Sequence, residues 1–299
     1  HIPPELAGKA LEDYKAYMDG LFAAYRKLLD ADVPKEDARF LLPYAFCSNF
    51  YCTLNARELV SLIRSIRLGQ GRAVPELRDI AGQLAGQLTE LFPALGTELE
   101  DFGPEEAPPE ESSPMFRGEP VWVPEEEAGS AELLAGPAAP GKLLERACRA
   151  ANPGTDKPFS LDALLASPRP RELEQLSYTF AVSGLTLAGI THLVRHRMQS
   201  VIVPPIQSVD HSRFILPDTI RTNPAALEIY RNALTEANRA ARALCEDPAL
   251  RPYSCYYAVS GNLMDVMTTL NARELMLIIR LRILLPQQPQ KAHGHMPDL

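Results

Sequence analysis

The densest cluster of polar side chains in the sequence lies at residues 191–200 and contains Arg195-His196-Arg197. Two guanidinium groups flanking an imidazole suit a phosphate or a planar anion, because guanidinium binds such groups through paired hydrogen bonds. On a continuous helix the two arginines would point about 200° apart, so they share a ligand only if the helix ends there. Pro204-Pro205 favours such an end. The triplet indicates an anion site, with a solvated basic turn as the alternative.

Two histidines in this cluster, His192 and His196, have the four-residue spacing of paired zinc ligands. The residue after His192 is Leu193, however, where a zinc protease has glutamate, and no third ligand is evident. Since a complete zinc site needs three or four protein ligands, we predict no metal site.

A second candidate is Asn-Ala-Arg-Glu-Leu, which occurs at residues 55–59 and again at residues 271–275. In a functional interpretation, the Asn and Arg side chains face a ligand at the start of a helix. In a structural one, Asn55 and Asn271 are helix N-caps, and Glu58 and Glu274 complete capping boxes. The two interpretations are compatible, because the cap leaves Ala-Arg unexplained.

These motifs belong to a longer internal repeat. Residues 53–59 recur letter for letter as residues 269–275, an offset of 216, and Ile63-Arg64 falls on Ile279-Arg280. Ile2-Pro3-Pro4 parallels Leu216-Pro217-Asp218 with a two-residue length difference. A period this long indicates a duplicated domain rather than a solenoid. We predict the C-terminal half of a first copy at residues 1–97, a linker at 98–127 and a second, divergent copy at 128–299, the first copy's N-terminal half being absent.

The predicted linker is the most acidic part of the chain. Residues 98–127 hold eleven acids against Arg117 together with six prolines, so this segment carries −10 and the rest of the chain +2, giving the net −8. Such a segment is typical of a solvated tether. The remainder has no basic field of the kind that holds a polyanion, which argues against nucleic-acid binding.

The compartment follows from the cysteines and the hydropathy. Five cysteines form an odd set without Cys-x-x-Cys spacing, which favours reduced thiols. No apolar run reaches the roughly 18 residues of a membrane span, and the first residues lack the order of a signal peptide. We therefore expect a cytoplasmic protein with no membrane partner.

Apolar periodicity and proline positions predict mostly helices. The expected helices cover residues 11–32, 36–47, a stretch after Asn55, 76–92, 190–198 and 224–244, while residues 176–182 could be a strand or a helix start. No Ser-His-Asp order, Gly-rich phosphate loop or dinucleotide fingerprint is present. The residues alone thus indicate a cytoplasmic, duplicated, anion-binding protein.

At these motifs the chain resembles the flavin-dependent thymidylate synthases. Their signature begins Arg-His-Arg, two residues, then Ser, as in residues 195–200. Residues 173–180 look like the family's Phe-Glu-His-x-x-Phe-Thr-Phe segment, residues 270–282 look like its Asn-Ala-Arg helix, and residues 33–43 match the stretch before that helix. The resemblance implies an α+β protomer, helix-rich with an antiparallel sheet, and a homo-oligomer with sites between subunits. A duplicated chain would then form a dimer acting as a pseudo-tetramer.

The resemblance also implies an activity and its residues. The family binds FAD and converts dUMP to dTMP with methylenetetrahydrofolate, and NADPH is a further co-substrate. Arg282 would polarise the nucleotide as the catalytic group. Flavin contacts carried over by matching position are Arg195, His196, Arg197, Asn55 with Arg57, and Asn271 with Arg273; nucleotide contacts are Arg39, Ser200 and Arg282.

The sequence departs from the family pattern in the nucleotide-binding loop after Ser200. Family positions for Asn or Gln, Ser and Arg are Ile202, Pro205 and Gln207 here, and Ile and Pro cannot make the expected side-chain hydrogen bonds. Other departures are Gln175 for the family His, Cys255 at the repeat position of Arg39, and Ile66 at that of Arg282. Three hypotheses follow: a composite-site enzyme, a degenerate flavin- or nucleotide-binding or scaffold partner, and a flavin enzyme with another substrate.

Overall fold

The computed structural model describes residues 1–47, 49–100, 113–155 and 158–280. Their contacts divide the chain into two compact units. The first contains residues 1–128, 186–188 and 204–264, and the second contains residues 129–185, 189–203 and those from 265 onward. These units differ from the predicted repeat copies, so the boundaries at residues 97 and 127 stay a prediction.

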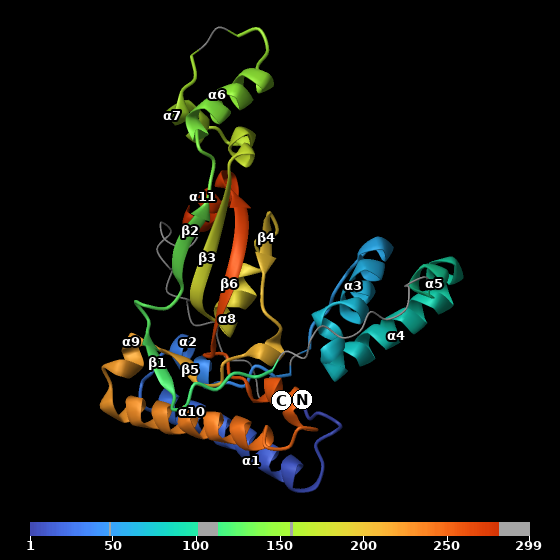
Figure 1. Cartoon of the computed structure of the whole chain (residues 1–299), viewed down its shortest axis with the longest axis vertical. Coiled ribbons are helices and arrows are strands. Elements are labelled where there is room, and N and C mark those ends of the chain that lie inside the picture. The colour runs from blue at the N-terminus through green and yellow to red at the C-terminus, as the bar shows by residue number, and fades with distance from the viewer. Residues whose placement is uncertain (48, 101–112, 156–157, 281–299) are drawn as a thin grey trace, which may run out of the picture. The chain divides into compact units, whose positions relative to one another are not determined.

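The first unit is mainly helical (Figure 1). Its helices, with 3₁₀ turns labelled η, are α1 (Gly8–Asp30), α2 (Lys35–Ala38), η1 (Arg39–Leu41), α3 (Ala56–Leu68), η2 (Gln70–Ala73), α4 (Pro75–Leu91), α5 (Pro93–Glu100), η4 (Ile206–Ser208), α9 (Asp218–Arg221), α10 (Pro224–Leu244) and η5 (Arg251–Tyr257). Its two strands, β1 (Val121–Pro124) and β5 (Arg213–Leu216), pair in parallel.

The core of this unit forms where α1 and α10 lie side by side (Figure 1). Both helices end close to the predicted positions. α10 begins at Pro224 because the Asn223 side chain accepts a hydrogen bond from the backbone N–H of Ala226, 3.2 Å away. Each helix buries an apolar stripe, which includes Tyr14, Leu21 and Leu28 on α1 and Tyr230, Ala237 and Leu244 on α10. The seven-residue steps within both stripes place these side chains on one face.

Two backbone hydrogen bonds in this unit are exchanged by the 216-residue offset. The N–H of Tyr44 donates to the carbonyl of Ala258 at 2.8 Å, and the N–H of Ser260 donates to the carbonyl of Leu42 at 2.9 Å. Adding 216 to Tyr44 and Leu42 gives Ser260 and Ala258. The two short stretches therefore pair around a local two-fold relation.

Two buried tyrosines repeat the relation. The hydroxyl of Tyr14 donates to the carbonyl of His1 at 2.9 Å, and that of Tyr230 donates to the carbonyl of Ile215 at 2.8 Å. Tyr14 and Tyr230 are separated by 216 residues, and the acceptors by 214, which matches the two-residue length difference in the sequence. Equivalent tyrosines thus tie each long helix to the chain that precedes it.

The prediction of a helix over residues 36–47 is wrong in extent. α2 ends at Ala38, one 3₁₀ turn follows, and Pro43 then forms an antiparallel bridge with Val259. The extended pairing with residues 258–260 takes up the backbone groups that a longer helix would need, and Pro43 has no N–H to give. The helices after Asn55 and over 76–92 are confirmed as α3 and α4, which share an apolar cluster centred on Ile63.

The acidic segment also differs from its prediction. Residues 101–112 lie outside the described residues, but β1 pairs with β5, and Trp122 stacks on Phe214 with ring centroids 5.8 Å apart. Arg117 Nε lies 2.6 Å from Asp210 Oδ2, a carboxylate that is almost fully buried. The aromatic side chains near the end of this segment therefore dock it on the first unit, so this part is not a solvated tether.

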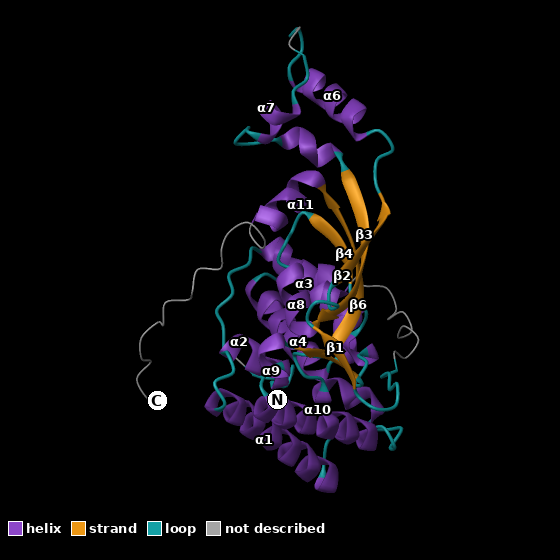
Figure 2. Cartoon of the chain, turned by 90° about the vertical axis from the view of Figure 1, so that its left-hand side faces the viewer, coloured by secondary structure: helices purple, strands orange, loops and turns teal. Residues whose placement is uncertain are grey.

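The second unit is built on a four-stranded sheet, whose strands are drawn in orange in Figure 2. The strand order is β2-β3-β6-β4, as Figure 1 shows. Its elements are β2 (Ser130–Ala135), α6 (Pro140–Ala151), α7 (Leu161–Leu165), η3 (Arg171–Gln175), β3 (Ser177–Thr186), α8 (Leu187–Leu193), β4 (Gln199–Ile202), β6 (Leu263–Asn271) and α11 (Ala272–Ile279). β3, α8 and β6 carry the chain across the boundary between the units. Antiparallel pairing of β2 with β3 and of β4 with β6 confirms an α+β fold with an antiparallel sheet.

Removing the hydroxyl of Tyr230 should destabilise the first unit. Tyr230→Phe leaves the buried carbonyl of Ile215 without its donor, which costs about 1–3 kcal/mol. Tyr25→Phe on α1 is the matched control, because no hydrogen bond engages that hydroxyl among the described residues. Urea unfolding followed by fluorescence of Trp122, the only tryptophan, measures both variants. Equal unfolding midpoints for the two would contradict the assignment.

Candidate functional site

The candidate site in the second unit starts at the junction of β6 and α11. Asn271 ends the strand with φ −84° and ψ 162°, and its Oδ1 accepts a hydrogen bond from the backbone N–H of Glu274 at 2.9 Å. In the first unit Asn55 caps α3 in the same way, accepting from the N–H of Glu58 at 2.9 Å. Both predicted N-caps are confirmed, and each cap fixes the first turn of its helix.

Glu274 extends the site from this helix start. Its Oε1 lies 3.0 Å from Nδ1 of His196, and the two side chains are only 10% and 12% exposed. The predicted capping box would have turned this carboxylate back toward its own cap. It meets the imidazole instead, and a carboxylate at one ring nitrogen fixes the orientation of the ring.

The loop between α8 and β4 holds the two arginines of the triplet. α8 ends at Leu193, so the helix predicted over residues 190–198 is shorter than expected and neither arginine lies on it. The Gln199 amide donates to the carbonyl of Leu193 at the end of α8, and its Oε1 accepts from the hydroxyl of Thr268 at 2.8 Å. Gln199 thus closes the loop, and Arg195 and Arg197 are both exposed on it.

Arg273 is held by a carboxylate of the same unit. Its guanidinium donates a short hydrogen bond to Glu174, and Arg171 lies 3.7 Å from the other oxygen of that carboxylate. The hydrogen bond from Arg273 holds the pKa of Glu174 below its ordinary value of 4.5. A ligand that used Arg273 would share it with Glu174.

The structure brings only some of the predicted residues together. The 195–197 loop and the start of α11 meet through His196 and Glu274 in the second unit. Ser200 is exposed on β4 of the same unit, whereas Arg282 lies outside the described residues. The remaining predicted contacts belong to the first unit and are all exposed: Arg39, Asn55 and Arg57.

Cys255, which corresponds to Arg39 at the 216-residue offset, lies in a different environment from Arg39. Cys255 is buried there, and burial raises the pKa of its thiol to about 12. Arg39 is exposed, and its Nε donates to the carbonyl of Glu36 at 3.2 Å. The buried position of Cys255 is therefore closed to an anionic ligand.

Sequence reasoning missed the ionic partners Glu174 and Glu274 and the bridging role of Gln199. It also missed a buried polar cluster before β5, where Asp210 and His211 are 1% and 2% exposed. Burial lowers the pKa of His211 to about 3, so the ring is neutral near neutral pH. The available signal was a run of three polar residues, 210–212, immediately before β5.

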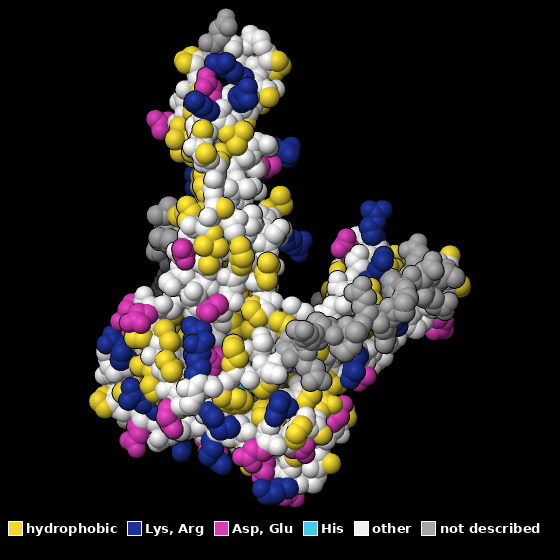
Figure 3. All heavy atoms as spheres, in the orientation of Figure 1, with side chains coloured by type: hydrophobic (Ala, Val, Ile, Leu, Met, Phe, Trp, Pro, Cys, Tyr) yellow, Lys and Arg dark blue, Asp and Glu magenta, His cyan; other side chains and the backbone are white. Residues whose placement is uncertain are grey.

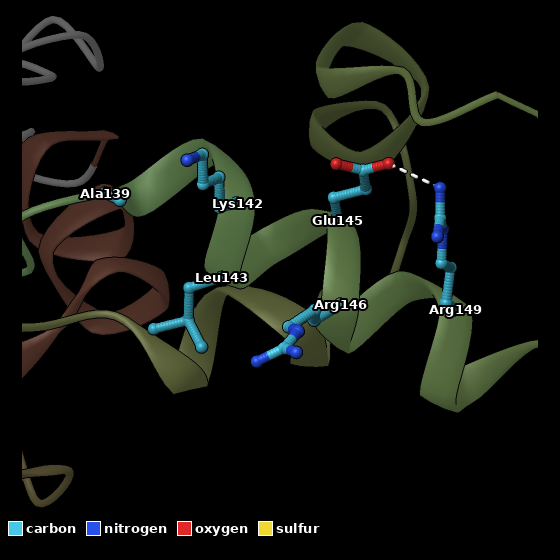
Figure 4. A pocket seen from close by; sticks show the side chains of 6 residues that line it. All are labelled: Ala139, Lys142, Leu143, Glu145, Arg146 and Arg149. Carbon is cyan, nitrogen blue, oxygen red and sulfur yellow. Dashed lines mark hydrogen bonds and ion pairs between the residues drawn. The ribbon is translucent and has the colours of Figure 1, made fainter.

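A separate surface pocket lies on α6 of the second unit (Figure 4). Several Lys and Arg side chains gather over this helix, at the top of Figure 3. Its lining includes Lys142, Arg146 and Arg149, the last of which pairs with Glu145 at 2.7 Å. No residue of the 195–197 loop or of α11 lines it. Within the described ranges, no cluster of three or more His, Cys, Asp or Glu side chains could hold a metal ion, and no helix is long and apolar enough to cross a membrane.

The pair between Arg273 and Glu174 predicts a pH effect on stability. Because the pKa of Glu174 is lowered in the folded protein, the pair stabilises it above the ordinary carboxyl pKa, and this contribution is lost as the pH falls through the folded value. Arg273→Met should therefore be less stable than the parent at neutral pH, by a margin that shrinks below pH about 4.5. Urea midpoints across that range test this. Arg57→Met, at the exposed repeat position, should show no such trend; a margin independent of pH would refute the assignment.

Comparison with known proteins identifies the family to which the chain is similar. The family described as thymidylate synthase complementing protein matches residues 1–94 and 135–293. The flavin-dependent thymidylate synthase of Sulfurisphaera tokodaii is 38% identical over 94 residues, which are 31% of this chain and 35% of the relative; that of Geobacter sulfurreducens is 34% identical over 96 residues, covering 32% and 39%. The chain thus spans about a third of the length of these relatives.

One solved structure among the matches is a UMP/dUMP methylase, PolB from Streptomyces cacaoi, bound with 5-Br UMP. It is 20% identical, covers 60% of this chain and 85% of its own, and aligns with a TM-score of 0.44. The family match, by contrast, takes in well over half of the residues. The chain belongs to the thymidylate synthase complementing protein family.

Proposed function

We propose that this chain takes part in the flavin-dependent methylation of dUMP to dTMP. Its family membership and the naming of its relatives as flavin-dependent thymidylate synthases support this proposal. The observation that carries it is the loop after α8, where His196 is oriented by Glu274 and flanked by two exposed arginines.

The donor set of this loop fits FAD. Among the described residues, no hydrogen bond or ion pair engages the side chains of Arg195 and Arg197, so both guanidinium groups are available to an anionic ring or a phosphate. Those two residues, His196 and the amide of Asn271 would hold the cofactor. The Oδ1 of Asn271 already accepts the cap hydrogen bond, which leaves its NH₂ group to donate.

When bound, flavin supplies the hydride that reduces the transferred one-carbon unit to a methyl group. Methylenetetrahydrofolate as the carbon donor and NADPH as the reductant belong to this proposal through the family. The protein's own part is to fix positive charge in place. Glu274 keeps His196 in one orientation, and Gln199 closes the loop, so little reorganisation is needed when an anion binds.

The nucleotide contacts proposed for dUMP are Arg39, Ser200 and Arg282. A fixed guanidinium beside the uracil would stabilise the anionic form of the ring, which is the form that attacks the one-carbon unit. Arg282 is assigned this role by its place in the family pattern. Asn55 with Arg57 would act as a second flavin contact, matching Asn271 with Arg273.

We further propose that residues 1–97 and 128–299 are two copies of the family's domain. The paired hydrogen bonds related by the 216-residue offset support this, as do the equivalent tyrosines Tyr14 and Tyr230. A dimer of such chains would act as a pseudo-tetramer. In this proposal Arg195-His196-Arg197 are the flavin contacts of the second copy, and Asn55, Arg57 and Arg39 are the flavin and nucleotide contacts of the first.

A second candidate function is flavin or nucleotide binding without dTMP synthesis, including turnover of a different substrate. The apolar positions in the nucleotide loop favour it. Ile202 is 67% exposed on β4, where the family pattern has a hydrogen-bonding Asn or Gln, and Pro205 stands for Ser. A surface of this kind suits a less polar ligand than uracil.

Absorption spectroscopy separates these functions. The purified chain should take up FAD, and dUMP should perturb the flavin band. Arg197→Ala should weaken FAD binding roughly ten- to a hundredfold, the loss expected for one charge-assisted hydrogen bond. Arg146→Ala, in the α6 pocket, is the matched control and should leave binding unchanged.

Two results would contradict the proposal. Protein that stays colourless with excess FAD would exclude the flavin site. A flavin band that dUMP does not alter, together with no tritium release from labelled dUMP, would favour the second candidate instead.

A further inference from the structure

One sequence pattern lies in two different environments. Residues 49–58 of the first unit correspond, at the 216-residue offset, to residues 265–274 of the second unit, and positions 53–58 are identical to 269–274. In the second unit this stretch is the end of the inner strand β6 and the start of α11. In the first unit only the helix start is formed, as α3, and residues 49–55 carry no strand.

The stretch in the second unit has partners along its whole length. Asp265 accepts from the N–H of Gly184 at 2.7 Å, and the hydroxyls of Thr269 and Thr179 are 2.9 Å apart. β4 pairs with it from Met267 to Leu270. Beyond the cap, Arg273 binds Glu174 and Glu274 binds His196. Every one of these partners comes from residues 174–203.

The equivalent groups of the first unit face solvent. Phe50 and Tyr51 are 82% and 107% exposed, against 5% and 39% for Val266 and Met267. Cys52 is exposed, whereas the equivalent Thr268 is only 4% exposed. Arg57 and Glu58 are exposed as well, and no side-chain contact engages them within the described part of the chain. Two adjacent exposed aromatic rings are typical of a surface that binds another polypeptide.

We propose that residues 49–58 dock a polypeptide module with the residue pattern of residues 174–203, which completes a second sheet around them. This rests on the proposed duplication. Each exposed group then has a counterpart of known type: Arg57 meets a glutamate, Glu58 an imidazole and Thr53 a hydroxyl, as their equivalents meet Glu174, His196 and Thr179. The backbone of residues 49–54 adds as an inner strand.

A second copy of this chain is a poorer occupant. Its own residues 174–203 already hold β6 and the start of α11, so it could receive residues 49–58 only by releasing them. Releasing β6 would expose Val266 and Leu270, which are each 5% exposed. The module is therefore a separate stretch of polypeptide with this pattern.

The test adds such a module to the full chain. A duplicate of residues 129–215 is placed directly before Ile2, the order in which the second copy has these residues. The readout is the rate at which iodoacetamide alkylates Cys52, together with hydrogen exchange of residues 50–54. If the module docks, alkylation of Cys52 should slow at least tenfold and the exchange of residues 50–54 should slow with it.

Charge reversal shows whether the docking is specific. Arg57→Glu in the extended chain should restore fast alkylation of Cys52, and Glu174→Arg in the added duplicate alone should slow it again. In the unextended chain Arg57→Glu should change neither the alkylation rate nor the unfolding midpoint, which is the matched control.

Three results would overturn the proposal. Cys52 could stay reactive although the added residues are protected from exchange. The added residues could stay unprotected from hydrogen exchange, which would contradict the proposal because the docked module should be folded on residues 49–58. The unextended chain could protect Cys52 as its concentration rises and as sedimentation shows a dimer, which would make a second copy the occupant. None of these readouts uses FAD, so a chain that fails to bind flavin but protects Cys52 would refute the methylation proposal alone.

Discussion

The hydrogen bond from the N–H of Glu274 to the Asn271 side chain determines where the polar groups of the second unit lie. It stops β6 and starts α11 within one residue, so the side chains of Arg273 and Glu274 leave the first turn in fixed directions. β6 is an inner strand held on both sides, which gives this turn a rigid base. His196 and Glu174 come from distant parts of the chain and meet groups that are already oriented.

The two copies of Thr-Leu-Asn-Ala-Arg-Glu-Leu separate what local sequence determines from what it does not. Both form the same cap with the same 2.9 Å hydrogen bond, because a cap needs only its own side chain and the next turn. Yet Glu274 is buried, whereas Glu58 faces solvent. Burial depends on the strands that lie alongside, and seven identical residues carry no information about those.

The same distinction explains which predictions hold. The limits of α1 and α10 follow from apolar periodicity and from Pro224 and Asn223, all of which are local signals. The helix predicted over residues 36–47 fails because Pro43 pairs with Val259. The described end of the acidic segment is not a solvated tether because Trp122 stacks on Phe214. These partners lie more than 90 residues away, and composition averaged over a window does not contain them.

The charge of the candidate site shows why its geometry matters more than its composition. Arg273 is balanced by Glu174, and the carboxylate of Glu274 faces His196, so the uncompensated positive charge of the site lies on Arg195 and Arg197. Exposed arginines on a flexible loop would bind an anion weakly, since binding would have to order the loop backbone, at roughly 1–2 kcal/mol per residue, as well as each long side chain, at roughly 0.5–1.5 kcal/mol. Here Gln199 fixes the loop at α8 and at Thr268, and Glu274 fixes its middle through His196. The backbone is therefore ordered before a ligand arrives, and only the two side chains remain to be ordered on binding.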